Sequence, residues 1–181
     1  MVSLSGMTWE GVLKDIERVA LAAGVAVQGT AAIAALRQRW EAIEAPASEP
    51  VPVMVLEWTD PPFTCGHWVP EQVTAAGGRE VMIHAGARSQ TTTWEAIADA
   101  DPEVLVVATC GQGLDENVSL ARELLHHPEA SQLRALKTGR IWAVDANAQF
   151  SRPAPRLVDG VETLAAILTG QPSPHAVHVT A

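Results

Sequence analysis

Hydrophobic positions beyond residue 50 follow two patterns: short continuous apolar runs, and apolar residues spaced three or four positions apart. Runs of roughly four to eight residues are typical of strands buried on both faces, whereas the wider spacing is typical of helices with one apolar face. The runs predict strands at residues 53–58, 80–83, 104–108 and 141–144. The spacing predicts helices at residues 69–76, 93–98, 114–126 and from Pro153 or Pro155 to about 168–170. This alternation predicts an α/β fold with a parallel sheet flanked by helices.

Residues 1–46 have a helical pattern throughout. Thr8 is a predicted N-cap, and apolar residues follow it at helical spacing as far as Gly24, where a first helix is predicted to end. A second helix is predicted from about residue 25 to residue 45, with a length of roughly 30 Å. The chain is thus predicted to have a long helical connector over 1–46, a single Rossmann-like ligand-binding lobe over 52–170 and a flexible tail over 171–181.

Residues 19–36 carry no charge and could be mistaken for a membrane span. This run is interrupted by two glycines and by the polar residues Gln28 and Thr30. Most of its other residues are alanine, which gains little in lipid. A buried, Ala-rich pair of helices is therefore predicted rather than a membrane-spanning segment.

The charge balance and the cysteines narrow the function further. Lys and Arg number 12 against 21 Asp and Glu, a net charge of −9, so neither nucleic acid nor an anionic membrane surface is a predicted partner. Two cysteines, Cys65 and Cys110, are too few for a disulfide framework, and whether they pair is left open. No basic segment followed by an apolar one occurs at Met1, so no export signal is predicted in these residues.

One loop has the features of a ligand-binding segment. Residues 60–68 read Asp-Pro-Pro-Phe-Thr-Cys-Gly-His-Trp and lie between a predicted strand and a predicted helix. The two prolines stiffen the backbone, and Gly66 permits either close approach of another segment or a positive φ. Phe63 and Trp68 are large apolar groups at the edge where open α/β sheets bind their ligands. A turn whose aromatic side chains pack into the core is the alternative.

This loop resembles the second lobe of the BtuF-like cobalamin-binding proteins. These are the substrate-binding components of cobalamin ABC importers, in the class of periplasmic binding proteins whose two lobes are joined by one long helix. The resemblance covers most of residues 53–168, and its segments are PPFTCGHW at 61–68, TWE at 93–95, residues 100–107, CG at 110–111, residues 136–145 and FSRPAPR at 150–156. It implies a connector helix and a second lobe, with the first lobe missing.

The resemblance implies cobalamin as the ligand and no catalytic cofactor. Aromatic faces suit a broad, flat ring, and a rigid loop can hydrogen-bond the ring's peripheral amides. The predicted ligand-binding residues are Pro62, Phe63, Thr64, Gly66, His67 and Trp68 in the first loop, and Gln149, Phe150, Ser151 and Arg152 in a second loop across the same cleft. His67 is either a hydrogen-bonded loop residue or a cobalt ligand. No catalytic residue and no metal site of the protein's own are predicted.

The chain departs from the family pattern at three positions. Ala148 and Ser151 stand where some members have acidic residues, and Ser89 stands where some have a tryptophan in the cleft.

Partners also follow from the resemblance. In that family a glutamate at the position of Glu95 docks to arginines of the importer's membrane subunits, although a carboxylate in a first helical turn is also favoured by the helix dipole alone. The chain is predicted to act as a half-protein or as a homodimer through the connector helices, whose apolar residues would form an exposed patch unless something covers them. The apolar residues concerned are Val12, Ile16, Leu36 and Trp40. The location of this chain is unknown, whereas the family is periplasmic or extracytoplasmic.

Two other functions stay open. An iron siderophore or haem is the alternative ligand, since the wider class shares the scaffold. The other alternative is a cysteine-dependent enzyme, because Cys110 lies between a predicted strand and a predicted helix, as in a nucleophile elbow, with His67 or His84 as its base. A binding module without catalysis is preferred, because the resembled family has a similar Cys-Gly pair that is not catalytic.

Overall fold

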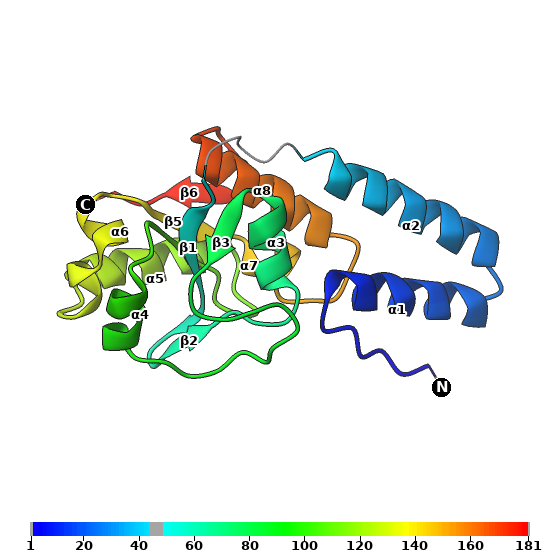
Figure 1. Ribbon diagram of the computed structural model, residues 1–181, viewed down its shortest axis with the longest axis horizontal. Coiled ribbons are helices and arrows are strands. Elements are labelled where there is room, and N and C mark those ends of the chain that lie inside the picture. Colours follow the sequence, from blue (N-terminus) through cyan, green and yellow to red (C-terminus); the bar gives the residue numbers. More distant parts are fainter. Residues whose placement is uncertain (1, 44–48, 181) are drawn as a thin grey trace.

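The chain runs from a helical hairpin through an α/β lobe to a strand at the far edge of the sheet (Figure 1). The computed structural model describes residues 2–43 and 49–180. The helices are α1 (Trp9–Ala22), α2 (Ala26–Glu41), α3 (Val69–Ala75), α4 (Trp94–Ala100), α5 (Leu114–His126), the 3-10 helix η1 (Ala130–Gln132), α6 (Arg134–Lys137), α7 (Ala146–Gln149) and α8 (Leu157–Thr169). The strands are β1 (Val51–Thr59), β2 (Pro62–Thr64), β3 (Gly78–Glu80), β4 (Val104–Val107), β5 (Ile141–Val144) and β6 (Ala176–His178).

The described strands form one mixed sheet in the order β2-β1-β4-β5-β6, and β3 pairs with the first part of β1. The central pairs β1–β3, β1–β4 and β4–β5 are parallel, whereas β1–β2 and β5–β6 are antiparallel. The predicted α/β fold is therefore confirmed, with antiparallel additions at both edges. Because the chain passes from β3 on one side of β1 to β4 on the other, a topological switch point lies between β1 and β4.

Alternate side chains of the central strands enter two separate apolar cores. Val53 and Val55 of β1 pack with residues of α3, α8 and the hairpin, while Met54 and Leu56 pack with residues of α4 and α5. All four side chains are at most 1% exposed. Since both faces of the sheet are covered, the strand sequences are continuously apolar instead of alternating.

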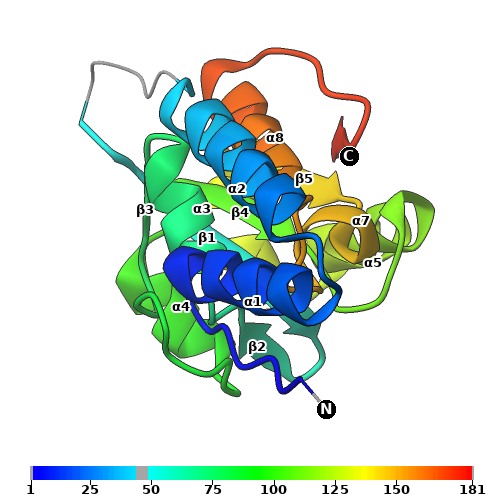
Figure 2. The same cartoon turned by 90° about the vertical axis from the view of Figure 1, so that its right-hand side faces the viewer.

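The N-terminal residues form a hairpin of two helices that lie side by side (Figure 2). The Thr8 hydroxyl accepts a hydrogen bond from the Gly11 N–H at 3.1 Å, which confirms the predicted N-cap. Gly24, with φ +73°, follows the end of α1 and turns the chain into α2. Trp9 and Trp40 stack at the other end of the hairpin, with ring centroids 4.4 Å apart. The second helix ends at Glu41, and residues 44–46 of the predicted connector lie outside the described residues.

Polar contacts attach the hairpin to the lobe. The Trp9 N–H donates to the Glu71 carboxylate of α3 at 2.5 Å. The Arg39 guanidinium of α2 pairs with Asp159 and Glu162 of α8 at 2.7 and 2.8 Å. The hairpin is therefore joined to the lobe at more than one point.

The apolar face predicted on the connector is covered by the lobe and does not form an exposed patch. Val12 and Leu36 are 0% and 8% exposed, and Ile16 and Trp40 pack against the same core, because this face turns toward the lobe. The surface on which a homodimer was expected is thus covered within the chain. Exposed apolar side chains instead cluster around the hairpin turn; they are Val19, Leu21, Val25 and Val27.

The uncharged run 19–36 is divided between α1 and α2 at Gly24. The predicted pair of helices is present, but most of α2 is not buried. Gly29 and Leu36 are the two buried residues of α2, whereas Val27 is 81% exposed. Over residues 2–43 and 49–180, no helix combines the length and apolar character needed to cross a membrane.

Several short elements differ from the prediction. Strand β3 occupies 78–80 instead of 80–83, while β2, η1, α6 and α7 were not predicted. Residues 171–181 were predicted to be a flexible tail, but β6 pairs there with β5, and Val179 is 2% exposed. Such short segments have no readable period; β2 begins with proline, which an edge strand tolerates, and β6 is held by its partner strand.

Candidate functional site

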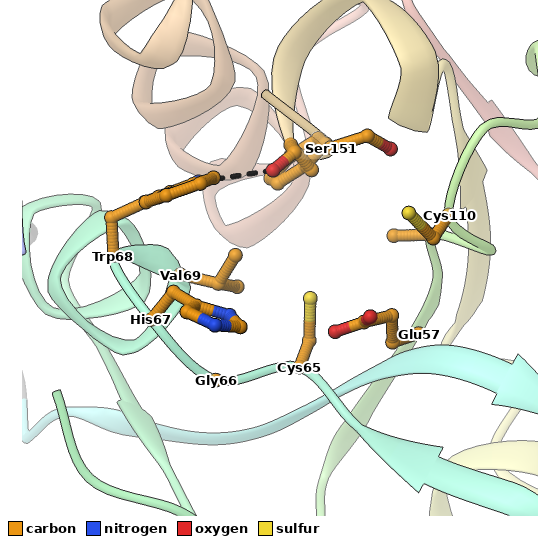
Figure 3. A pocket seen from close by; sticks show the side chains of 10 residues that line it. Glu57, Cys65, Gly66, His67, Trp68, Val69, Cys110 and Ser151 are labelled. Carbon is orange, nitrogen blue, oxygen red and sulfur yellow. Dashed lines mark hydrogen bonds between the residues drawn. The ribbon is translucent and has the colours of Figure 1, made fainter. Parts of the chain in front are cut away.

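A cavity of about 190 Å³ opens at the carboxyl ends of β1 and β4, at the switch point of the sheet (Figure 3). Its wall combines the end of β1, the 65–69 segment, the turn after β4 and the segment after α7. The lining residues are Glu57, Cys65, Gly66, His67, Trp68, Val69, Ala108, Cys110, Phe150 and Ser151. The two loops predicted to face each other therefore do meet at one cavity.

Buried hydrogen bonds hold these walls together. The Trp68 indole N–H donates to the Phe150 carbonyl at 3.0 Å, so the first loop is attached directly to the second. Behind this contact, the Gln72 amide donates to the carbonyls of Gln149 and Leu157 at 3.2 and 2.8 Å. Such bonds between distant segments make the cavity a largely preformed site.

The backbone around His67 has an unusual conformation. His67 has φ +57°, in the left-handed region that side chains with a Cβ rarely adopt. Its N–H donates to the Ala87 carbonyl at 2.7 Å, and its carbonyl accepts from the Gly86 N–H at 2.9 Å. The preceding Gly66 is required for close approach, because a Cβ there would lie 2.5 Å from the Ala87 oxygen. Of the two options open for Gly66, close approach is thus the one realised.

A chain of polar groups lies beside the cavity. The Ser89 hydroxyl donates to the Glu57 carboxylate and accepts from the Gly66 N–H at 3.0 Å. The same oxygen lies 3.4 Å from His67 Nδ1. Glu57, at the end of β1, is thereby connected to the imidazole through one hydroxyl group.

Both cysteines face the cavity and neither forms a disulfide. Burial, reinforced by the negative charge of Glu57, raises the pKa of the Cys65 thiol well above its ordinary value, so this group is a neutral thiol. Cys110 is exposed, in the turn that follows β4. Figure 3 shows the two sulfur atoms on different sides of the Glu57 carboxylate.

A second, apolar hollow of about 280 Å³ adjoins the first and shares Glu57 and Cys110 with it. Trp58, Pro61 and Phe63 supply the rest of its wall. Trp58 and Phe63 are cross-strand partners in β1 and β2, and Trp58 is 44% exposed. We call this pair of aromatic residues the aromatic shelf.

The structure separates the predicted ligand-binding residues into groups. Gly66, His67, Trp68, Phe150 and Ser151 line the cavity, and Phe63 lies on the aromatic shelf. The other four, Pro62, Thr64, Gln149 and Arg152, line neither hollow.

Their local structure explains why these four residues differ from the others. Thr64 is buried, and its hydroxyl bonds the backbone of Gln90, while Pro62 begins β2. Gln149 is 2% exposed and borders a different cavity beside α8, and Arg152 is exposed. Whether the lining residues bind a ligand remains a prediction.

Trp68 and Phe150 belong mainly to the core, at 7% and 3% exposed. The alternative interpretation of the 60–68 loop, in which aromatic side chains pack inward, is therefore correct for Trp68 and not for Phe63.

Glu57, Cys65 and Ser89 belong to the site but were not among the predicted residues. Glu57 gave one signal, because it is a charged residue at the end of the apolar run of β1. Ser89 gave only an indirect signal, because it stands where some members of the resembled family have a tryptophan in the cleft; its hydroxyl contacts arise only through the fold.

Glu95 is exposed in the first turn of α4, whose Thr93 cap accepts from the Ala96 N–H at 3.1 Å. Its docking role stays a prediction. For the enzyme alternative, Cys110 does follow β4 as predicted; within the described part of the chain, its thiol has no hydrogen bond to His67 or His84. Those residues also contain no group of three or more His, Cys, Asp or Glu placed to hold a metal ion.

Proteins of known structure share this fold. A periplasmic binding protein from Veillonella parvula is 20% identical with a TM-score of 0.76, over 89% of this chain and 57% of that one. A periplasmic heme-binding protein from Pseudomonas aeruginosa is 24% identical with a TM-score of 0.73, over 96% and 66%. The periplasmic vitamin B12-binding protein BtuF of Vibrio cholerae is 17% identical with a TM-score of 0.63, over 92% and 63%.

The chain thus spans less than two thirds of the length of each of these structures. Curated protein sequences give no match. The family model described as periplasmic binding protein, in contrast, matches residues 2–148, which include the hairpin, β1 to β5 and the cavity wall as far as α7. The chain therefore belongs to the periplasmic binding protein family.

Proposed function

We propose that this chain is a ligand-binding module of a cobalamin (corrinoid) ABC import system and that it binds without catalysis. The observation that supports this best is the aromatic shelf beside a preformed cavity at the switch point of the sheet. A flat ring can lie on Trp58 and Phe63, while its substituents reach backbone groups of the 65–69 segment.

The charge of the site favours a neutral ring over an anionic one. Neither hollow is lined by Lys or Arg, and Glu57 contributes a carboxylate to both. The peripheral amides of a corrin need no cationic partner, whereas the carboxylates of haem and of many siderophores usually pair with Arg or Lys. Haem or a siderophore is accordingly the second candidate, supported by the His67 imidazole at the cavity.

One wall of a cleft is expected to bind weakly. A two-sided cleft with a Kd near 1 nM corresponds to about −12 kcal/mol, and half of this energy gives a Kd in the tens of micromolar. The cost of immobilising the ligand is met in full in either case, so the affinity can only be lower than this estimate.

Calorimetric titration with cyanocobalamin tests the proposal, with hemin titrated in parallel. We expect a Kd of roughly 10–100 μM for cyanocobalamin, weakened at least about tenfold by combined Trp58→Ala and Phe63→Ala substitutions. Val27→Ala is the matched control, because Val27 is 81% exposed at the hairpin turn. Binding that is unaffected by the double substitution would exclude the aromatic shelf, and hemin binding alone would select the second candidate.

Light scattering on the same samples gives the oligomeric state. Micromolar binding by a monomer fits a single wall of a cleft. Sub-micromolar binding by a dimer would show instead that two copies build the cleft together.

Docking of Glu95 to importer membrane subunits is part of the same proposal. It is supported by the exposure of this carboxylate on α4, away from the cavity wall. Glu95→Ala should leave ligand binding unchanged and weaken association with the membrane subunits; unchanged association would exclude this contact.

A further inference from the structure

We propose that His67 Nε2 is an axial ligand of the metal at the centre of the bound ring, and that Ser89 and Glu57 hold the imidazole in the tautomer that this requires. This inference rests on the proposed function, because it assumes a ring-bound cobalt or iron with an exchangeable axial position. It adds a specific metal–protein bond to a site whose other lining residues are apolar side chains, two cysteines, Ser151 and the Glu57 carboxylate.

The hydrogen bonds around Ser89 determine which imidazole nitrogen carries the hydrogen. A carboxylate only accepts, so the single hydroxyl hydrogen of Ser89 is donated to Glu57. Ser89 Oγ then acts as an acceptor toward its other neighbours, the Gly66 N–H at 3.0 Å and His67 Nδ1 at 3.4 Å. This contact favours the tautomer in which Nδ1 carries the hydrogen, and in that neutral imidazole Nε2 keeps a free lone pair.

The free nitrogen is available to the cavity. His67 is among the lining residues, and Figure 3 shows its imidazole beside Val69, as one of the side chains that surround the hollow. Within residues 2–43 and 49–180, Nε2 has no hydrogen-bond partner. The imidazole of His67 also packs beside the Trp68 ring system, with the two ring centroids 5.5 Å apart, and this contact limits rotation of the imidazole.

The backbone supports the same conclusion. The positive φ of His67 is maintained by two backbone hydrogen bonds to the 86–87 segment. A sparsely populated conformation that its surroundings over-determine is typical of ligand sites, where it directs a side chain. A carboxylate that orients an imidazole through hydrogen bonds is also typical of histidine metal ligands, whose basicity it raises.

A single imidazole nitrogen suits a metal that already has four ring nitrogens. A bare divalent ion usually takes three or four protein ligands, which one histidine cannot provide. In the proposed step, the Nε2 lone pair replaces a water molecule on Co(III) or Fe(III). The oxidation state of the metal and the bonds of the ring do not change.

Absorption spectra of the intact chain with aquocobalamin and with hemin, titrated separately, test the inference. The wild type should convert the bound ring from its water-ligated to its nitrogen-ligated spectrum. His67→Gly is the informative variant, because glycine accepts φ +57° without strain and so preserves the loop. It should still bind the ring on the aromatic shelf, about 10–100-fold more weakly, with the water-ligated spectrum. Added imidazole should then restore the nitrogen-ligated spectrum.

The controls separate this inference from the proposed function. His84→Ala removes an exposed histidine that lines neither hollow and should change nothing. Ser89→Ala should weaken conversion to the nitrogen-ligated form, and Ser89→Thr should restore it. Cyanocobalamin, whose axial positions are both filled, should be insensitive to His67→Gly.

Two results would overturn the inference while leaving the proposed function intact. One is a water-ligated spectrum for the ring bound to the wild type; the other is a nitrogen-ligated spectrum for the ring bound to His67→Gly. If the folded wild type binds no ring at all, both the proposed function and this inference fail.

Discussion

The carboxyl group of Glu80 should make the stability of this protein depend on pH between about 4.5 and 8. Burial raises the pKa of Glu80 from 4.5 to about 8, although backbone N–H groups that favour the ionised form partly oppose this. The Val55 N–H donates to it at 3.2 Å and the Met82 N–H at 3.0 Å. Since β3 ends at Glu80, its side chain provides the acceptor that a longer β3 would have offered to β1.

The direction and the size of this pH dependence follow from the pKa values of Glu80 in the unfolded and folded states. A pKa raised on folding means that the folded state favours the protonated carboxyl group. Its contribution to stability is therefore fully present below pH 4.5, falls as pH rises toward 8 and is absent above that. At about 1.4 kcal/mol per pH unit, the whole change is about 5 kcal/mol.

Urea unfolding monitored by tryptophan fluorescence at intervals from pH 5.5 to 8.5 measures this contribution. Wild type should lose about 3 kcal/mol more than Glu80→Gln between pH 5.5 and pH 8, since glutamine has no proton to release. At pH 5.5 the variant should be less stable, by about 1–3 kcal/mol, because its amide NH₂ faces a backbone N–H that has lost its acceptor. The two stability curves should therefore converge or cross as pH rises.

Glu95→Gln serves as the control, because Glu95 is an exposed carboxylate in the first turn of α4. Its curve should run parallel to that of the wild type. Parallel curves for wild type and Glu80→Gln would show instead that Glu80 is ionised in the folded protein at pH 5.5, and that its three backbone donors outweigh burial.

Three further predictions concern packing and accessibility. Gly29→Ala should destabilise the chain by about 1–3 kcal/mol in urea unfolding, because the new Cβ would lie 2.3 Å from the Ala20 Cβ; Gly29→Ala with Ala20→Gly should recover most of this loss, and no recovery would refute the contact. Trp68→Ala should cost about 3–5 kcal/mol of stability, since the ring is 7% exposed; a loss under about 1 kcal/mol would mean that Trp68 is a surface residue. Iodoacetamide followed by mass analysis should modify exposed Cys110 before buried Cys65, and the reverse order would contradict the placement of the two thiols.

The central elements of the fold were predictable because each has a strong local signal. Strand β4 is a continuous apolar run that proved to be buried on both faces, and α5 begins and ends where its spacing predicts. Thr8 was readable as an N-cap from the residues that follow it, and the helix that Thr93 caps was predicted to begin at this residue. These signals lie within a few residues of one another, so no tertiary information is needed.

The edge strands of the sheet and the surface of the helical hairpin were not predictable in the same way. Strand β6 forms because β5 offers an unpaired edge, a condition that residues 176–178 do not encode. The apolar face of α1 and α2 was visible, but its partner was not: whether it meets a second copy or the lobe depends on where the chain returns. The structure shows that it meets the lobe, because Val12 and Leu36 belong to the same buried core as residues of the lobe.

Ser89 shows why the polar part of the site could not be derived from its sequence. Comparison with the resembled family shows only that a serine stands here where some members have a tryptophan. Its contacts reach 32 residues back to Glu57, 22 to His67 and 23 to Gly66, so no local pattern relates the four positions. The loop that contains Ser89 is instead placed by backbone bonds from His67 and Thr64 to Ala87 and Gln90. The hydroxyl group can therefore take part only after the aromatic loop and its neighbour have docked, which makes the orientation of His67 a consequence of the tertiary fold.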